Sequence, residues 1–173
     1  MPHSLYLFLE GHDDERFFSR VLSRLLRRRY SNIQVILYAE DPPKVTRRFV
    51  RSIRSAGDDY IFAKDIDEAP CVTESKRKAI NKFQVDENNI IIVIKEIECW
   101  YLCGLGNQSC EKLRIDRLSA NTDSMTKEDF DELIPKDMSR IEFMQQILER
   151  YDIPVGRSKN RSFRYFLEKW VDS

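Results

Sequence analysis

The chain has 173 residues, with 29 lysines and arginines balanced by 29 aspartates and glutamates, so its formal net charge is zero. A composition that is 42% hydrophobic and 34% charged is typical of a folded globular protein and excludes an intrinsically disordered one. The longest apolar run, residues 90–94, is far too short to span a membrane. Neither a secretion signal nor a disulfide-rich pattern is visible, so we expect a cytoplasmic protein with reduced cysteines.

Short apolar segments alternate with helical segments through the first hundred residues. Residues 5–9 are typical of a buried strand, and Asp13 or Asp14 is predicted to cap the helix that follows. Further strands are expected at residues 33–38, 60–63 and 90–94, and further helices at residues 42–57 and 71–83. The alternation predicts an α/β fold, a Rossmann-like sheet of about four parallel strands flanked by helices on both faces.

The pattern changes after residue 98, where we expect only helices. A short helix is predicted at residues 99–103, and a capping-box pattern starts another at Thr126. Two more apolar patterns predict helices at residues 141–148 and 163–170. We therefore expect an α/β domain at residues 1–110 and a helical C-terminal extension packed on it at residues 111–173.

Carboxylates follow three of the four predicted strands. Glu10 comes after the first strand, Asp65 and Asp67 after the third, and Glu98 after the fourth, while Asp14 lies one helical turn beyond Glu10. Parallel sheets place their sites at the carboxyl ends of the strands, so we expect these side chains to share one edge. Crowded carboxylates repel one another unless a cation neutralises them, and their oxygens suit Mg²⁺ or Mn²⁺. The pattern predicts a metal site for phosphodiester chemistry.

The residues Leu7–Glu15, followed by the strand end Asp65-Ile-Asp67, resemble the Toprim domain. That family carries a glutamate after its first strand and an Asp-x-Asp motif after its third, which correspond to Glu10, Asp65 and Asp67. Asp14 and Glu98 are more similar to the nuclease branch, which includes the overcoming-lysogenization-defect nucleases and small stand-alone relatives linked to phage defence. The resemblance covers about residues 4–104.

The resemblance implies a nuclease that depends on Mg²⁺ or Mn²⁺. Glu10, Asp65 and Asp67 would hold the metal, with Asp14 and Glu98 as further ligands or water-positioning groups. Lys95 precedes the acids after the fourth strand and is a candidate for offsetting transition-state charge, or else a salt-bridge partner. The alternative is a non-catalytic Toprim-fold module that binds a partner in a defence system.

Positive charge gathers in residues 16–57, which contain eleven lysines and arginines but two acids. In the second helix we expect a basic face opposite an apolar stripe of Val45, Phe49 and Ile53. Such a face binds phosphates of DNA or RNA, unless it is only a solvated surface. Its residues are Lys44, Arg47, Arg48, Arg51 and Arg54.

Other candidates are weaker. Cys99 and Cys103 share a helix spacing but lack nearby histidines, so buried thiols are favoured over a zinc site. Trp100 and Tyr101 are expected in the core. No membrane partner is expected, and a protein partner or a homodimer stays open.

Overall fold

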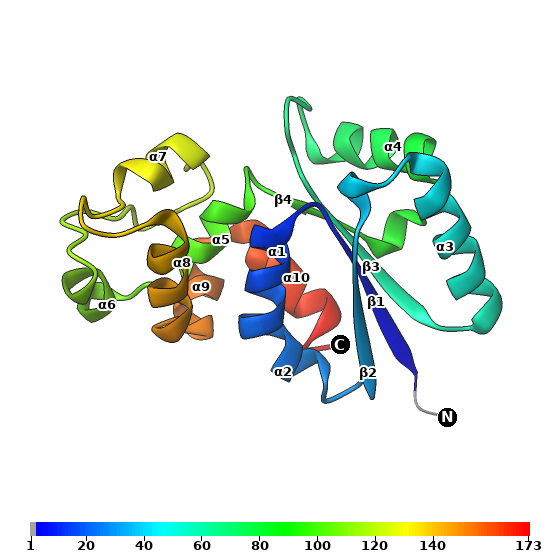
Figure 1. Cartoon of the computed structure of the whole chain (residues 1–173), viewed down its shortest axis with the longest axis horizontal. Helices are drawn as coiled ribbons and strands as arrows, with labels where there is room; N and C mark the ends of the chain where they lie inside the picture. The colour runs from blue at the N-terminus through cyan, green and yellow to red at the C-terminus, as the bar shows by residue number, and fades with distance from the viewer. Residues whose placement is uncertain (1–2) are drawn as a thin grey trace. The chain divides into compact units, whose positions relative to one another are not determined.

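The computed structural model describes residues 3–173 of a chain that divides into two compact units, Met1–Ile92 and Val93–Ser173 (Figure 1). Within residues 3–173, no helix is long and apolar enough to cross a membrane. Residues 93–110, which the sequence pattern places in the α/β domain, belong to the second compact unit. The assignment of residues 111–173 to a separate extension stays a prediction.

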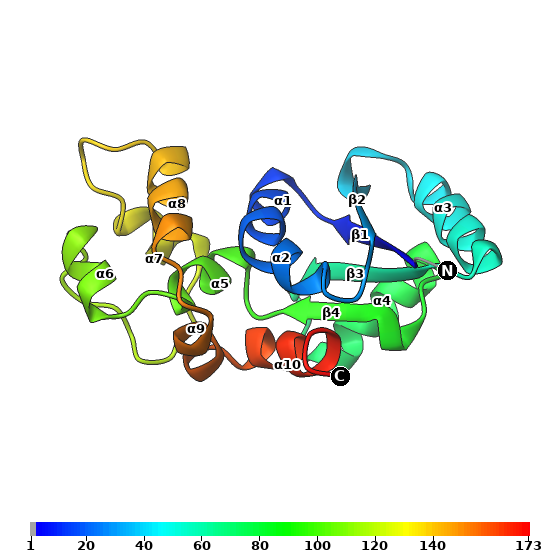
Figure 2. The ribbon, with the colours of Figure 1, turned by 90° about the horizontal axis from the view of Figure 1, so that it is seen from below.

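A four-stranded parallel sheet confirms the predicted α/β fold. The strands are β1 (Ser4–Leu9), β2 (Asn32–Leu37), β3 (Asp59–Asp65) and β4 (Ile90–Val93). Their order is β2-β1-β3-β4, and Figure 2 shows them side by side. After β1 the chain continues to β2 at one edge of the sheet, and after β3 it continues to β4 at the opposite edge. The carboxyl ends of β1 and β3 therefore form the switch point where sheets of this kind bind ligands.

Helices cover both faces of this sheet, as predicted. The first helical stretch comprises α1 (His12–Phe17), a π-helical turn η1 (Phe18–Leu22) and α2 (Ser23–Leu26). The helices α3 (Pro43–Ala56) and α4 (Val72–Phe83) contact each other and lie on the other face (Figure 1). Two 3-10 turns, η2 (Tyr38–Glu40) and η3 (Glu87–Asn89), flank them in the sequence.

Two local predictions for these helices are wrong. The N-cap of α1 is Gly11, not an aspartate, and Asp14 occupies the third helical position instead. Of the stripe predicted on α3, Ile53 is buried, but Phe49 is 44% exposed and Val45 is partly exposed; Thr46 and Val50 are buried instead. Several apolar residues of α3 could form the inward face, and the burial of Thr46 and Val50 shows that the inward face is rotated from the predicted stripe.

After Val93, the last residue of β4, the regular structure of the second unit is helical, and no further strand follows within the described part of the chain. Its central helix α5 (Ile97–Cys103) is buried along its whole length and contacts α7, α8 and α9. Trp100 and Tyr101 are fully buried, and Cys99 and Cys103 are buried free thiols, as predicted. The other helices are α6 (Asn107–Lys112), α7 (Lys127–Glu132), α8 (Arg140–Glu149), α9 (Ile153–Lys159) and α10 (Arg161–Trp170).

Gly104, at the C-terminal end of α5, is required by a close approach of Tyr151. A Cβ atom at Gly104 would lie 2.4 Å from the Tyr151 ring, which is held because its hydroxyl donates to the Trp100 carbonyl at 2.8 Å. We expect Gly104→Ala to lower the free energy of unfolding by about 2–3 kcal/mol through overpacking. Gly106→Ala, with nothing within 4 Å of its Cβ position, is the matched control; it replaces only the N-cap glycine of α6 and should cost at most about 1 kcal/mol.

Tryptophan fluorescence during urea unfolding measures this difference, because both tryptophans of the chain, Trp100 and Trp170, lie in the second unit. Equal unfolding midpoints for the two glycine variants would contradict the prediction.

Candidate functional site

The end of β1 and the end of β3 bring Glu10 beside Asp65. The two strands pair in parallel with Phe8 opposite Phe62, and the same register continued by two residues sets Glu10 level with Lys64. A Glu10 carboxylate oxygen lies 3.5 Å from the backbone nitrogen of Asp65. Two of the predicted metal ligands therefore lie next to each other at the switch point of the sheet.

Asp14 reaches the same edge from the first turn of α1. Its side chain is buried, and it accepts a hydrogen bond from the backbone N–H of Gly11 at 3.3 Å. This bond ties the carboxylate to the turn that leaves β1. An acidic side chain is also favourable in this first turn because of the helix dipole.

Asp67 adopts a left-handed backbone conformation, with φ of 51°, two residues after the end of β3. Aspartate tolerates this conformation better than most residues do, which explains how the chain turns within the Asp-x-Asp motif. The exposed carboxylate of Asp67 forms an ion pair with Lys64, the residue that precedes Asp65. The turn therefore places the Asp67 carboxylate beside the Lys64 ammonium group.

Tyr38 is near enough to the four predicted carboxylates of this unit for their charges to act on it. Its ring, directly after β2, stacks on Phe62 at 4.4 Å between ring centroids. Burial raises the pKa of the Tyr38 hydroxyl above its usual value, and negative charge raises it further. The charges responsible are those of Glu10, Asp14, Asp65 and Asp67. The hydroxyl therefore keeps its proton and remains a hydrogen-bond donor.

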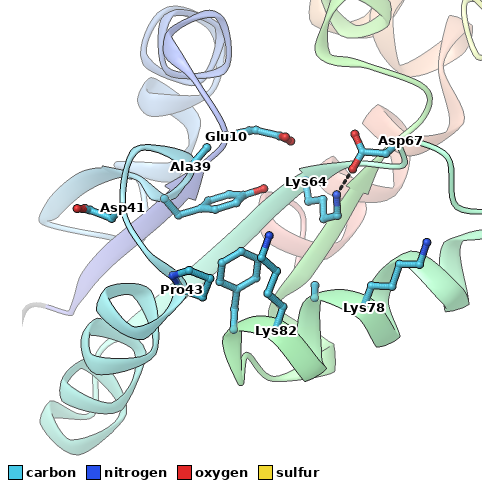
Figure 3. A pocket seen from close by; sticks show the side chains of 11 residues that line it. Glu10, Ala39, Asp41, Pro43, Lys64, Asp67, Lys78 and Lys82 are labelled. Atoms are coloured by element: carbon cyan, nitrogen blue, oxygen red, sulfur yellow. Dashed lines mark hydrogen bonds and ion pairs between the residues drawn. The ribbon is translucent and has the colours of Figure 1, made fainter.

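A cavity of about 350 Å³ opens beside these groups (Figure 3). Glu10 and Asp67 lie on one side of it in Figure 3, and Lys78 and Lys82 extend from α4 on the opposite side. Its volume is in the range of small-ligand sites. The complete lining is Glu10, Tyr38, Ala39, Asp41, Pro43, Lys64, Asp67, Lys78, Ala79, Lys82 and Phe83.

The oxygen donors suit a magnesium or manganese ion by type, since carboxylates are the side chains that these ions prefer. Among residues 3–173, however, no three acidic, histidine or cysteine side chains are placed so that they could hold a metal ion. The ion pair with Lys64 holds one of the carboxylates, Asp67. Binding of an ion would thus require side-chain rotation at this edge.

Two further predicted residues, Lys95 and Glu98, belong to the second unit. Glu98 is buried and forms an ion pair with Arg140 at 2.5 Å. Burial raises the pKa of Glu98, and the positive charge of Arg140 opposes that rise. Lys95 is exposed. The contacts of Glu98 are those of a buried ion pair, so the site that we describe consists of residues from the first unit.

The predicted basic face lies on α3. Lys44, Arg48 and Arg51 are exposed, and Arg47 is partly exposed. Arg54 already has partners within the protein, since it forms an ion pair with Asp86 at 2.7 Å and donates a hydrogen bond to the Gln84 carbonyl. Phe49 is exposed beside Arg48. The face therefore presents four cations and one aromatic ring to a partner.

Sequence reasoning missed Tyr38, Lys64, Lys78 and Lys82. A search for carboxylates at strand ends passes over β2, which ends beside a tyrosine. Lys64 directly precedes the Asp-x-Asp motif, and Lys78 and Lys82 are one helical turn apart, so a search for cations at these spacings would have found them.

No protein-family model, curated protein or solved structure matches this chain.

Proposed function

We propose that this protein is a nuclease that depends on Mg²⁺ or Mn²⁺ and hydrolyses phosphodiester bonds of nucleic acid, as the resemblance to the Toprim family implies. The observation that carries the proposal is the position of Glu10 beside Asp65 at the switch point of the sheet, next to a cavity that Glu10 and Asp67 line. Phage defence or nucleic-acid processing is the proposed setting.

The chemistry follows from the side chains at this edge. Glu10, Asp14, Asp65 and Asp67 would hold the metal, which supplies a water of lowered pKa and neutralises developing charge when bound. Lys64, which is now paired with Asp67, is placed to offset the charge of a substrate phosphate. Burial and the nearby carboxylates keep the Tyr38 hydroxyl protonated, so it can donate to a phosphate oxygen.

The test is an activity measurement on the purified full chain. Single- and double-stranded DNA and RNA are incubated with Mg²⁺, with Mn²⁺, or with EDTA. Cleavage of at least one substrate with either metal, and of none in EDTA, is the expected result. If every substrate stays intact with both metals, the proposal fails.

The basic face of α3 makes a separate prediction about nucleic-acid binding. Replacing Arg48 and Arg51 with glutamine removes two exposed cations and should weaken binding about tenfold at low salt, with a smaller effect at high salt. The matched control replaces two exposed lysines of the other unit, Lys112 and Lys136, with glutamine. Fluorescence anisotropy of a labelled strand measures both. Equal affinities of the two double variants would show that the α3 face is only solvated surface.

A non-catalytic interaction module is the second candidate. The ion pair of Lys64 with Asp67, and the lack of a preformed three-ligand group among residues 3–173, favour it. This candidate predicts partner binding that is independent of metal and is unchanged when Glu10 and Asp65 are replaced by their amides.

A further inference from the structure

The cavity beside the carboxylates has a divided charge. Its lining includes the acidic residues Glu10 and Asp67 and the lysines Lys64, Lys78 and Lys82, while the carboxylate of Asp41, a further lining residue, points away from them in Figure 3. In Figure 3 the ammonium groups of Lys78 and Lys82 face the side on which Glu10 and Asp67 lie. A lining of this kind can hold an anion on the α4 side while a cation occupies the acidic side.

Lys78 and Lys82 are available to an anion. They are four residues apart on α4, so they lie on the same face of the helix, and both are exposed. Within the described part of the chain, neither forms an ion pair with a carboxylate, whereas Lys64 pairs with Asp67. The Lys82 ammonium group lies 5.2 Å from the centre of the Phe83 ring, which borders the cavity. Lys78 lies near the charge of Glu74 one turn earlier on α4, but among the described residues neither lysine is held in a close ion pair, so both ammonium groups can turn to a ligand in the cavity.

Tyr38 supplies an independent indication of a ligand. The residue lines the cavity, is 5% exposed, and its hydroxyl has no hydrogen-bond partner among residues 3–173. A buried polar group without a partner costs about 1–3 kcal/mol, and such groups in native proteins call for an explanation. An acceptor oxygen on a bound ligand would satisfy this donor.

We propose that the cavity binds a phosphate group, with Lys78 and Lys82 supplying the positive charge and the Tyr38 hydroxyl donating a hydrogen bond. A phosphate offers several acceptor oxygens and negative charge, which match two ammonium groups and one hydroxyl. We assign this phosphate to a nucleic-acid strand, and that assignment rests on the proposed function. It makes α4 the element that positions the substrate beside the carboxylates of β1 and β3.

Binding without turnover tests the proposal. The probe is a short labelled single strand, with or without a 5′-phosphate, and its anisotropy is measured in EDTA at low salt. Replacing Lys78 and Lys82 with glutamine is expected to raise Kd at least about tenfold, because two charge-assisted contacts are lost. The matched control removes two exposed charges from the other unit, in the variant Lys112→Gln/Lys136→Gln, and should change Kd by less than about twofold.

Tyr38→Phe gives a second readout that a structural role would not produce. The phenyl ring keeps the stacking on Phe62, and the variant loses only a hydroxyl without a partner. We therefore expect a melting temperature that is unchanged or higher, together with a Kd that rises about fivefold. A lower melting temperature with an unchanged Kd would overturn the assigned role of the hydroxyl.

The arms of the assay separate the sources of the phosphate. Binding of the phosphorylated strand alone identifies a terminal phosphate, and equal binding of both strands identifies an internal one. If excess inorganic phosphate displaces the bound labelled strand, the free ion also occupies the site. Each of these results supports the proposal if the Lys78 and Lys82 variant loses the binding and the control keeps it. No binding by any probe, or equal binding by both double variants, overturns it.

The result is distinguishable from failure of the proposed function. If the Lys78 and Lys82 variant loses binding in EDTA but no metal supports cleavage, the phosphate site stands and the nuclease proposal fails. If metal-dependent cleavage occurs with an unchanged KM in that variant, the nuclease proposal stands and the phosphate site fails.

Discussion

Asp65→Asn and Glu10→Gln are each expected to lower metal-dependent cleavage by at least about 10³-fold. The amide keeps the shape of the side chain but removes the negative charge that would hold the ion, and a catalytic ion contributes several kcal/mol of transition-state stabilisation. Both residues lie at the switch point, where a Glu10 oxygen is 3.5 Å from the Asp65 nitrogen. Initial cleavage rates across a series of Mn²⁺ concentrations measure the loss.

The same variants should not destabilise the fold. Glu10 and Asp65 are adjacent, so removing one of their two negative charges reduces the repulsion between them, and the melting temperature is expected to stay the same or rise. Glu87→Gln is the matched control, because it makes the same chemical change at an exposed position just before β4, at the amino end of the sheet. Equal cleavage rates for Glu87→Gln and Glu10→Gln would remove the carboxylate cluster from the mechanism.

Arg140→Ala is expected to lower the free energy of unfolding of the second unit by about 3 kcal/mol. The change leaves the buried Glu98 carboxylate without its ion-pair partner, and an uncompensated buried charge is strongly destabilising. It also removes the guanidinium that lies 4.9 Å from the centre of the Phe130 ring. Urea unfolding followed by tryptophan fluorescence reports on this unit, which holds both tryptophans.

The effect of Arg140→Ala should depend on pH in a defined direction. Burial raises the pKa of Glu98 in the folded protein, so the folded state binds this proton more tightly than the unfolded state does. Stability therefore falls as the pH rises from the usual carboxyl pKa through the raised one. The charge of Arg140 lowers the pKa of Glu98, so loss of Arg140 raises this pKa further and widens the pH range over which stability falls. The variant should therefore be more destabilised at neutral pH than at about pH 4.

A double-mutant cycle isolates the pair. In a Glu98→Gln background, removing Arg140 should cost clearly less than in the parent, because no buried charge is left unpaired. Arg114→Ala breaks an exposed ion pair with Asp137 and serves as the matched control, with little or no expected change. If Arg140→Ala lowers the free energy of unfolding equally in both backgrounds, the ion pair of Glu98 with Arg140 does not contribute to stability.

The fold could be predicted from the sequence because local patterns carry it. Four short apolar segments separated by helical segments specify a parallel sheet, and the strands at residues 4–9 and 90–93 lie within one residue of the predicted limits. The rotation of α3 could not be predicted in this way. Val45, Phe49 and Ile53 form a plausible stripe, but packing buries Thr46 and Val50 and leaves Phe49 exposed.

The candidate site was likewise predictable only in part. Carboxylates at strand ends are visible in the sequence, since parallel strands deliver their ends to one edge. Whether they serve a metal or hold an ion pair depends on neighbours that are distant in sequence. Glu98 meets Arg140 across 42 residues, a pairing that no local pattern signals.

The balanced total of 29 positive and 29 negative side chains excluded a strongly charged protein and did not identify a partner. By itself the sequence determined an α/β fold, acids at strand ends and a basic helix, because these follow from periodicity and from the geometry of parallel strands. Only the tertiary structure decided that Lys78, Lys82 and Tyr38 border one cavity with Glu10 and Asp67. The physical reason is that a site forms where strand ends and a helix face meet in space, and their spacing along the chain does not encode that meeting.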